Sequence, residues 1–507
     1  MKYYLGLDNG GTNTKAALYT GKGDEVGCVS VETRAIIPRT GFVERDMEEM
    51  WEANCSIIRD LLKQTSVAPE DIAGVAACGH GKGLYLWGKD GKPVRNGIIS
   101  TDNRAWEYPL KWKEDGTEEK VFALSCQHIL ACQPVSLLAW LKDHEPGSLN
   151  DIQWIFECKD YLRYRLTGEA RGELTDYSGT NFMNLHTREY DDALLELFGL
   201  EELRHALPPL CKSTDICGRI SREAAEKTGL AEGTPVAGGM FDVDGCAVAV
   251  DVLSEDYVCV VAGTWSINEY IRKEPVMDGK VLLNSLFCMP EYYLIEESSA
   301  TSAGNNDWFL KTLLPELTRE QHEKGQSVFD ITNEWVKSIP PEEFCPVFLP
   351  FLLASNVHPN AMGSFVGMSS YHTRAHLMRS VYEGVAFSHK YHIDKLLATR
   401  EKPFKGIRLA GGVARSEVWL QMFADVIGLP IEASGVNEPG ALAAAICGAI
   451  AAGEYSGFAE AAEHMCDLAP AVQPNPANYE AYTRKYKMYL KVIGALDSVW
   501  DEMREML

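Results

Sequence analysis

The run Gly6-Leu7-Asp8-Asn9-Gly10-Gly11-Thr12-Asn13-Thr14-Lys15 constrains the fold of this chain more than any other feature. It begins within an apolar strand predicted over residues 3–7, and a second predicted strand follows at 16–19. A strand, a tight glycine turn and a returning strand form a β-hairpin. The two glycines let backbone N–H groups approach an anion closely, and the two threonines add hydroxyl donors. The run therefore predicts a phosphate site at a hairpin turn.

Asp8 ends the first strand and is an acceptor suited to a hydrated Mg²⁺ near phosphates. An ordinary Asn-Gly hairpin turn, with Asp8 in an Asx-turn, is the alternative that the run leaves open. A Walker loop is excluded because no Gly-Lys-Ser/Thr follows. The dinucleotide fingerprint is excluded because the chain returns as a strand rather than entering a helix.

The length and net charge of the chain limit the classes of protein to which it can belong. A chain of 507 residues is too long for one core, so two or more domains are expected. The net charge of -24 disfavours nucleic-acid and anionic-membrane partners. None of the 14 cysteines forms a Cys-x-x-Cys pair, and many lie in apolar runs. Together with an N-terminus that leads directly into a strand and no apolar run of membrane-spanning length, this predicts a cytoplasmic location.

The strand–turn–strand pattern recurs in the second half of the chain. Strands are predicted over 257–262 and 266–271, with the turn Gly263-Thr264 between them. Two such units near the starts of two halves indicate a duplicated fold, with domains over 1–250 and 251–507. Helices are predicted over 47–64 with Asp46 as N-cap, over 416–427 with Ser416 as N-cap, and over 479–507 as one long amphipathic helix.

An ordered series of motifs runs along almost the whole chain. In order, they are Asp8 to Thr14; Cys78-Gly79-His80-Gly81-Lys82-Gly83; Ser100 to Ala105; Pro134 to Pro146; Lys159-Asp160-Tyr161-Leu162; Gly238-Gly239-Met240-Phe241-Asp242; Gly263-Thr264-Trp265; Gly363 to Gly367; and Gly411-Gly412 with Arg415-Ser416. Each motif alone is weak, whereas the ordered set is specific.

Taken together, these motifs resemble the FGGY family of carbohydrate kinases, relatives by fold of actin and hexokinase. The resemblance implies an α/β protein with two actin-like, ribonuclease-H-like domains, each a mixed sheet flanked by helices, and an active-site cleft between them. It implies that the first domain binds sugar and the second binds ATP, with Mg²⁺ required. The expected partners are thus a small-molecule sugar and ATP, and a homodimer is one assembly compatible with the sequence.

The resemblance places the general base at Asp242. The residues agree, since Asp242 follows the strand-ending Gly238-Gly239 at a point where a helix begins. Asp244, two residues on, is the rival base, and a role for Asp242 as helix cap alone is the other alternative. Asp8 is expected to hold Mg²⁺ through water.

The ATP site implied by the resemblance draws on both glycine turns and on the Gly-Gly motif near residue 411. Its residues are Gly10, Gly11, Thr12, Asn13, Gly263, Thr264, Gly304, Trp308, Gly411, Gly412 and Ser416. The threonines are expected to donate to phosphate oxygens, and the helix after Ser416 to add partial positive charge at its N-terminus. Trp308 is equally well explained as a packing residue.

The sugar site implied by the resemblance comprises His80, Lys82, Asp102 and Arg104, together with the base Asp242. Asp102 suits vicinal hydroxyls because a carboxylate accepts two hydrogen bonds. Each of the others has a second interpretation. His80 fits a structural histidine, Lys82 a solvated lysine, and Arg104 an ion pair in a surface loop.

Within the family, three runs resemble the bacterial kinases of L-xylulose and 3-keto-L-gulonate: Gly81 to Leu84, Pro134 to Leu138 and Gly239 to Val243. The chain departs from the xylulokinase pattern at Lys82, which replaces a sugar-contacting histidine, and at Leu138 and Ala139, where a lysine is usual. We therefore expect ATP-dependent phosphorylation of L-xylulose or a related pentulose. The alternatives are D-xylulose, ribulose, 3-keto-L-gulonate or erythritol as acceptor, or a catalytically silent protein that binds sugar and nucleotide.

Overall fold

The computed structural model describes residues 1–506, which form two compact units. Unit 1 comprises Met1–Leu253, Ile271–Ile295 and Glu438–Cys466. Unit 2 comprises Ser254–Tyr270, Glu296–Asn437 and the residues from Asp467 onward. Unit 1 thus contains two segments from the second half of the chain, 271–295 and 438–466. The predicted domains 1–250 and 251–507, by contrast, are each continuous in sequence. The assignment of sugar and ATP to domains 1–250 and 251–507, and the cleft between them, stay predictions.

Unit 1 is built on a mixed sheet with strand order β13-β14-β5-β1-β2-β3, and β15 also pairs with β5. The strands are β13 Ile216–Arg219, β14 Pro235–Ala237, β5 Ile72–Gly79, β1 Tyr3–Asn9, β2 Asn13–Thr20, β3 Glu25–Glu32 and β15 Met240–Phe241. The predicted hairpin is confirmed, because β1 and β2 are antiparallel and the turn lies between Asn9 and Asn13. β5 lies parallel to β1 on its other side.

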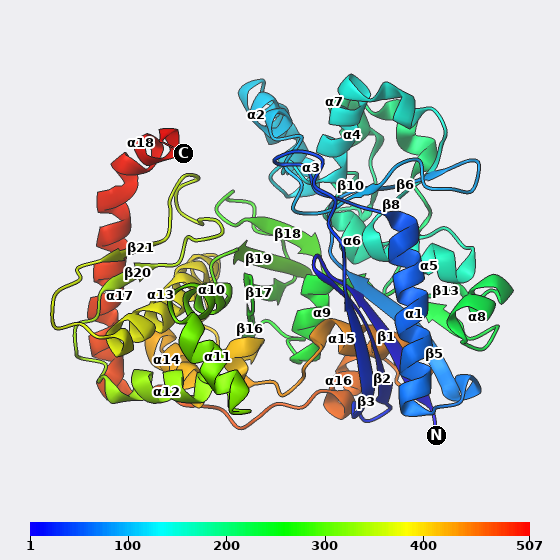
Figure 1. Ribbon diagram of the computed structural model, residues 1–507. Helices are drawn as coiled ribbons and strands as arrows, with labels where there is room; N and C mark the ends of the chain where they lie inside the picture. The colour runs from blue at the N-terminus through cyan, green and yellow to red at the C-terminus, as the bar shows by residue number, and fades with distance from the viewer. Residues whose placement is uncertain (507) are drawn as a thin grey trace. The chain divides into compact units, whose positions relative to one another are not determined.

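Two helices cover opposite faces of this sheet (Figure 1). The helix α1, Met47–Thr65, begins as predicted, and the Asp46 side chain accepts hydrogen bonds from the backbone N–H groups of Glu48 and Glu49. The helix α15, Pro439–Ala451, lies against β1 and β5 on the other face. It approaches the strands so closely that a Cβ atom built on Gly6 would lie 1.8 Å from the Ala441 carbonyl oxygen.

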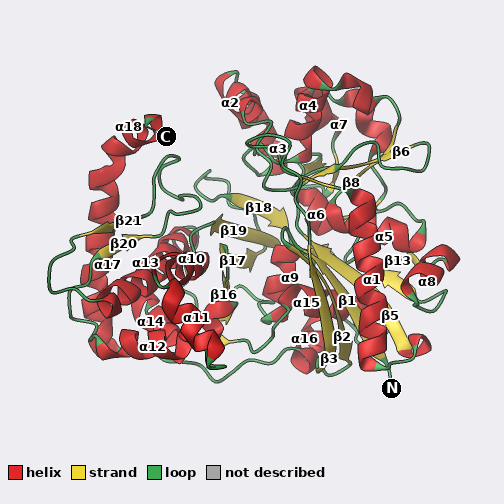
Figure 2. Cartoon of the chain, viewed as in Figure 1, coloured by secondary structure: helices red, strands yellow, loops and turns green. Residues whose placement is uncertain are grey.

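The second sheet has strand order β18-β19-β17-β16-β22-β23. Its strands are β18 Leu283–Leu286, β19 Tyr293–Ser299, β17 Ser266–Arg272, β16 Tyr257–Ala262, β22 Gly406–Ala410 and β23 Ile431–Ala433. The hairpin of β16 and β17 and the parallel neighbour β22 repeat the arrangement of β1, β2 and β5. Sequence and pairing therefore agree on a duplicated α/β architecture, with helices flanking both sheets (Figure 2).

The C-terminal residues up to 506 differ from the single helix predicted over 479–507, whose last residue lies outside the described part of the chain. The helix α17, Pro476–Leu496, is followed by a 3₁₀ turn, Asp497–Val499, and by α18, Trp500–Glu505. The tighter turn changes the direction in which the next side chains point, and Trp500 is buried after it. The prediction of one continuous helix was wrong, because the apolar pattern does not reveal this change of helix type.

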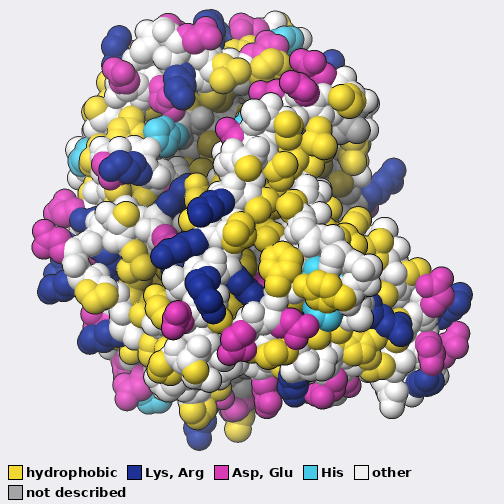
Figure 3. Space-filling model, turned by 90° about the vertical axis from the view of Figure 1, so that its left-hand side faces the viewer, with side chains coloured by type: hydrophobic (Ala, Val, Ile, Leu, Met, Phe, Trp, Pro, Cys, Tyr) yellow, Lys and Arg dark blue, Asp and Glu magenta, His cyan; other side chains and the backbone are white. Residues whose placement is uncertain are grey.

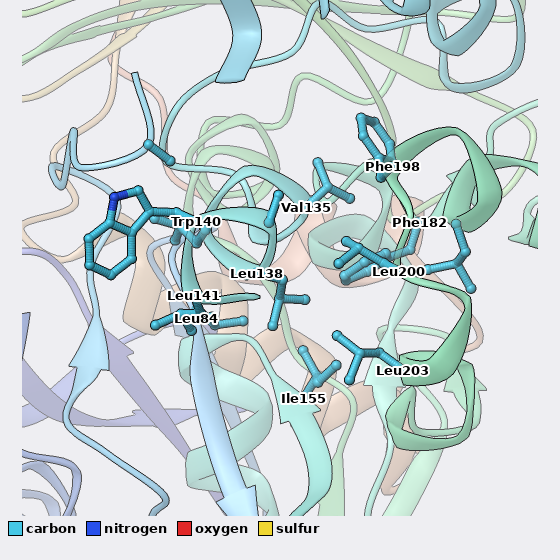
Figure 4. Packing of buried hydrophobic residues seen from close by; sticks show 14 of the residues in the cluster. Leu84, Val135, Leu138, Trp140, Leu141, Ile155, Phe182, Phe198, Leu200 and Leu203 are labelled. Atoms are coloured by element: carbon cyan, nitrogen blue, oxygen red, sulfur yellow. The ribbon is translucent and has the colours of Figure 1, made fainter. Parts of the chain in front are cut away.

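An apolar cluster of unit 1 supports the loops that carry the predicted sugar residues. The helix α4, Pro134–His144, contributes Val135, Leu138 and Leu141 to it, and Phe182, Leu200 and Leu203 pack from the other side (Figure 4). Leu138, where the resemblance led us to expect a lysine, is fully buried. Leu138 is therefore a core residue of unit 1.

On the face drawn in Figure 3, acidic side chains are scattered and basic side chains gather near the middle, with apolar side chains between them. Among the described residues, no helix is both long and apolar enough to cross a membrane.

Candidate active site

The backbone of the turn between β1 and β2 is hydrogen-bonded to a buried arginine, Arg45. Gly10 N–H donates to the Asn13 carbonyl at 3.0 Å. Arg45 Nη2 donates to the carbonyl oxygens of Gly10 and Gly11 at 3.2 and 2.8 Å. Carbonyl oxygens bound in this way repel a phosphate less, so Arg45 favours an anion at the turn. No motif in the sequence pointed to Arg45.

Three predicted phosphate-binding glycines leave open space around them. A Cβ atom built on Gly11, Gly263 or Gly412 would have no atom within 4 Å. None of the three has a positive φ, so backbone conformation does not require glycine there. Thr12 and Thr264 are exposed beside these glycines, and Asn13 is half-buried. A ligand that needs close approach to the backbone fits both turns.

Asp8 lies at the end of β1 against the N-terminus of α15. A Cβ atom built on Gly440, the second residue of that helix, would lie 2.9 Å from the Asp8 carboxyl carbon. Burial raises the pKa of Asp8 to about 6, although Lys15 opposes the shift. Lys15 forms an ion pair with Glu438.

A hydrated metal ion fits Asp8. No group of three or more His, Cys, Asp or Glu side chains suited to a metal ion occurs among the described residues. A metal at Asp8 would thus take one carboxylate from the protein and its other ligands from water and phosphate. Mg²⁺ is commonly bound in this way.

Unit 2 contains a cavity of about 570 Å³ beside the turn Gly263-Thr264. Five of the predicted ATP residues line it: Gly263, Thr264, Gly304, Gly412 and Ser416. Gly411 lies next to this lining with a φ of 98°, and a Cβ atom there would lie 2.7 Å from the Ala262 carbonyl oxygen. Trp308, on the helix α10 Gly304–Leu313, is 38 % exposed and lies outside the lining.

The other lining residues were not predicted to contact ATP, and Asn333, Tyr382 and Trp419 are among them. Asn333 accepts hydrogen bonds from Ser416 Oγ at 2.9 Å and from the Tyr382 hydroxyl at 3.0 Å. Tyr382 in turn stacks on Trp419, with ring centroids 4.1 Å apart. Ser416 also caps α14, Glu417–Ile427, as predicted, because its side chain accepts from the Trp419 backbone N–H. Asn333 is some eighty residues away in the sequence from Ser416, so no local pattern could have paired them.

Asp242 is the first residue of the helix α9, Asp242–Ala249, and follows β15 directly. The preceding Gly238-Gly239 has a structural explanation, because Cβ atoms there would lie 2.2 Å from the Lys212 carbonyl oxygen and 1.9 Å from the Ala77 carbonyl oxygen. The double glycine therefore does not by itself favour a base over a helix cap.

Burial separates Asp242 from its rival Asp244. Asp242 is half-buried, whereas Asp244 is fully buried and accepts a hydrogen bond from the Cys288 backbone N–H at 3.1 Å. Burial raises the pKa of Asp244 well above its usual value. A base must reach its substrate and be ionised, and the buried Asp244 is unsuited on both counts.

The loop of residues 80–83 lies beside the segment that leads into Asp242. A Cβ atom on Gly81 would lie 2.7 Å from the Phe241 ring. The half-buried Lys82, with a φ of 64°, places its ammonium group 4.9 Å from the centre of that ring. The structure thus brings the predicted sugar loop next to the predicted base.

His80 is buried, and its Nε2 lies 2.9 Å from the Tyr85 hydroxyl. Burial, with a smaller effect of Arg45, lowers the pKa of His80 to about 3, so the ring is neutral near pH 7. These contacts favour the structural interpretation of His80.

Asp102 and Arg104 bind each other in the interior of unit 1. Both oxygens of Asp102 accept from the Arg104 side chain, at 3.0 and 2.9 Å, and one also accepts from Val43 N–H at 2.6 Å. Glu44 pairs with Arg104 at 2.8 Å. The ion pair is buried rather than on the surface, and Arg104 Nη1 has no hydrogen-bond partner among the described residues. The side chains of Asp102 and Arg104 have no exposed surface, so in this structure they bind each other rather than face solvent.

Family models and known relatives match this chain over nearly its whole length. The N-terminal domain of the FGGY family of carbohydrate kinases matches residues 3–249, and the C-terminal domain of that family matches residues 258–452. The chain is 38% identical to the L-xylulose/3-keto-L-gulonate kinase of Escherichia coli (strain K12), over 99% of both chains. It is 36% identical to the probable L-xylulose kinase of Pasteurella multocida, over 98% of this chain and 100% of the relative.

The solved structures show the same fold. The ligand-bound xylulose kinase from Lactobacillus acidophilus superposes with a TM-score of 0.89 at 24% identity, covering 99% of this chain and 100% of that chain. The xylulose kinase from Rhodospirillum rubrum gives a TM-score of 0.87 at 24% identity, covering 99% and 100%.

Proposed function

Because the chain belongs to the FGGY family of carbohydrate kinases and is a sugar kinase, we propose that its acceptor is L-xylulose or a related pentulose, with Asp242 as the general base. The sugar hydroxyl attacks the γ-phosphorus of ATP, its proton passes to Asp242, and ADP leaves. Phosphoryl transfer depends on positioning and charge neutralisation, and the residues below supply both.

The half-buried Asp242 beside the Lys82 loop carries this proposal. It is a carboxylate at the start of a helix, adjacent to the loop that we expect to bind sugar. The fully buried Asp244 is unsuited to the same task.

The two glycine turns are proposed to bind the phosphates of ATP. Thr12 and Thr264 donate to phosphate oxygens, and the open space at Gly11 and Gly263 admits them to the backbone. Asp8 would hold Mg²⁺, which neutralises phosphate charge when bound. The cavity lined by Gly412 and Ser416 accommodates the adenosine part.

A panel of acceptors tests the substrate. We expect sugar-dependent ADP release, measured with a coupled assay, to have its highest kcat/KM with L-xylulose among L-xylulose, D-xylulose, both ribuloses, 3-keto-L-gulonate and erythritol. Hydroxyl contacts discriminate strongly between such isomers. A higher kcat/KM with any other acceptor would replace L-xylulose. Tight sugar binding without any sugar-dependent ADP release would instead indicate a binding protein that has lost catalysis.

The variant Lys82→Met tests whether the Lys82 ammonium group binds the carboxylate of a substrate. We expect kcat/KM for 3-keto-L-gulonate to fall by about tenfold to a hundredfold, because a charge-assisted hydrogen bond is lost. The value for L-xylulose, which has no carboxylate, should change by no more than about threefold.

Lys92→Met is the matched control, since Lys92 also follows a glycine in a turn but is exposed. It should leave both acceptors unaffected. An equal loss on both sugars in Lys82→Met, or no loss on either, would contradict a role in recognising the carboxylate.

A further inference from the structure

Residues 238–241, which lead into Asp242, are held by backbone contacts from several directions. Gly239 N–H donates to the Ser213 carbonyl at 2.9 Å, and Gly238 N–H donates to the Asp215 carbonyl at 3.0 Å. The buried Arg163 donates from Nη1 to the Gly238 carbonyl at 2.6 Å. This segment ends at Phe241, whose backbone N–H has a side-chain partner.

That partner is Thr175, in the short helix α6 Leu174–Ser178. The Phe241 N–H donates to Thr175 Oγ1 at 2.9 Å. Thr175 is 1 % exposed, so this bond is shielded from water. Its hydroxyl proton is directed away from Phe241, because Oγ1 donates to Glu173 Oε2 at 2.7 Å. The hydroxyl is therefore fixed as an acceptor for the residue immediately before Asp242.

Glu173 is held in place in its turn. Its Oε1 accepts from Thr175 N–H at 3.1 Å and from Ser213 Oγ at 2.8 Å. Its Oε2 lies 3.2 Å from the ammonium group of Lys159, which is fully buried. Ser213 thus contacts the segment directly, through its carbonyl to Gly239, and also binds Glu173 through its hydroxyl.

Lys159 forms ion pairs with three carboxylates of this buried network. Besides Glu173, it pairs with Asp176 at 2.8 Å and with Asp160 at 3.4 Å. None of these side chains is exposed enough to touch a dissolved substrate directly. A buried charge network of this kind limits the movement of the groups bonded to it.

From this geometry we propose that Thr175 is a positioning residue for the transfer reaction, holding the Phe241–Asp242 backbone so that the Asp242 carboxylate stays aligned with the acceptor hydroxyl. Glu173 and Lys159 orient the Thr175 hydroxyl for this purpose. The inference rests on the proposed role of Asp242 as base, and its test is designed to separate the two.

Thr175→Val removes the hydroxyl and keeps the shape of the side chain. We expect kcat to fall by about 10²-fold, since a small misplacement of a reacting group has effects of that size. KM for the sugar and for ATP should change by no more than about twofold, because Thr175 does not touch either ligand. Thr175→Ser keeps the hydroxyl and should restore kcat to within about threefold of the unmodified enzyme.

Thr228→Val is the matched control. Thr228 is also fully buried in unit 1, and its hydroxyl likewise accepts from a backbone N–H, that of Leu230 at 3.2 Å, and donates to an oxygen, the Ala224 carbonyl at 2.7 Å. It lies at the end of α8, Arg222–Thr228. This variant should lose a comparable amount of thermal stability and keep its kcat.

If Thr175→Val fails to fold, Ser213→Ala takes its place, because it removes one hydrogen bond of Glu173 while leaving the backbone bond to Gly239 intact. An unchanged kcat in Thr175→Val, or in Ser213→Ala where that variant is needed, would overturn the inference. So would an equal loss of kcat in Thr175→Val and Thr228→Val.

Asp242→Asn is measured alongside these variants. If Asp242→Asn remains active, the proposed base is wrong. An inactive Asp242→Asn together with a fully active Thr175→Val overturns the positioning role alone.

Discussion

Asp242→Asn is expected to lower kcat by about 10²- to 10⁴-fold while the protein still binds sugar and ATP. The amide has the shape of the carboxylate and accepts hydrogen bonds, but it does not take up the proton of the attacking hydroxyl. Steady-state turnover by the coupled assay gives kcat, and titration calorimetry with each ligand gives the affinities. A near-normal kcat would remove Asp242 from the mechanism.

Asp244→Asn is the control for that result. The Asp244 carboxyl is fully buried, and its raised pKa favours the neutral form, which an amide imitates. The amide oxygen of Asn can still accept from Cys288 N–H. We expect kcat to stay within about tenfold of the unmodified enzyme. Loss of turnover in Asp244→Asn with an active Asp242→Asn would exchange the two roles.

Gly6→Ala is expected to destabilise the protein by about 3 kcal/mol or more. A Cβ atom at Gly6 would lie 1.8 Å from the carbonyl oxygen of Ala441 and 2.7 Å from its carbonyl carbon, so the backbones of β1 and α15 must move apart. The N-terminus of α15 lies against Asp8, and turnover should therefore fall as well. Urea unfolding followed by circular dichroism measures the loss of stability.

Gly11→Ala provides the comparison, since it is the same substitution five residues further along. Its Cβ atom would meet nothing within 4 Å, and Gly11 has no positive φ. Stability should change by less than about 0.5 kcal/mol. The KM for ATP should rise by about tenfold, because the methyl group takes up space proposed for a phosphate. Equal stability losses in the two variants would contradict the close packing at Gly6, and an unchanged KM for ATP in Gly11→Ala would contradict the phosphate site.

Much of the fold was predictable from local patterns. The strands at the phosphate turn, their repetition at 257–272 and the caps at Asp46 and Ser416 all appear in the structure where the sequence indicated them. Alternation of apolar residues and a hydroxyl or carboxylate before a helix are short-range signals, and neighbouring residues suffice to produce them. The long C-terminal helix was predicted less well, because a change from α to 3₁₀ geometry leaves no mark in apolar spacing.

The candidate site was predictable only in part. The motifs indicated which residues carry polar groups, and five of the predicted ATP residues do line one cavity. They left an ion pair of Arg104 open, but they did not indicate that this pair with Asp102 is buried, that His80 is hydrogen-bonded to Tyr85, or that Arg45 supports the first turn. Those facts depend on which of several neighbouring groups a side chain contacts after folding.

The sequence alone therefore determined the local elements, the duplicated α/β plan and the family. Only the tertiary structure showed that α15 covers β1, although the two lie more than four hundred residues apart in the sequence, and that Gly6 permits this helix packing rather than the turn. Only the tertiary structure showed that the Thr175 hydroxyl binds the backbone N–H of the residue before Asp242. The reason is physical: a cap or an apolar stripe depends on residues a few positions apart, whereas contact between two backbones depends on parts of the chain that meet only when the whole unit is folded.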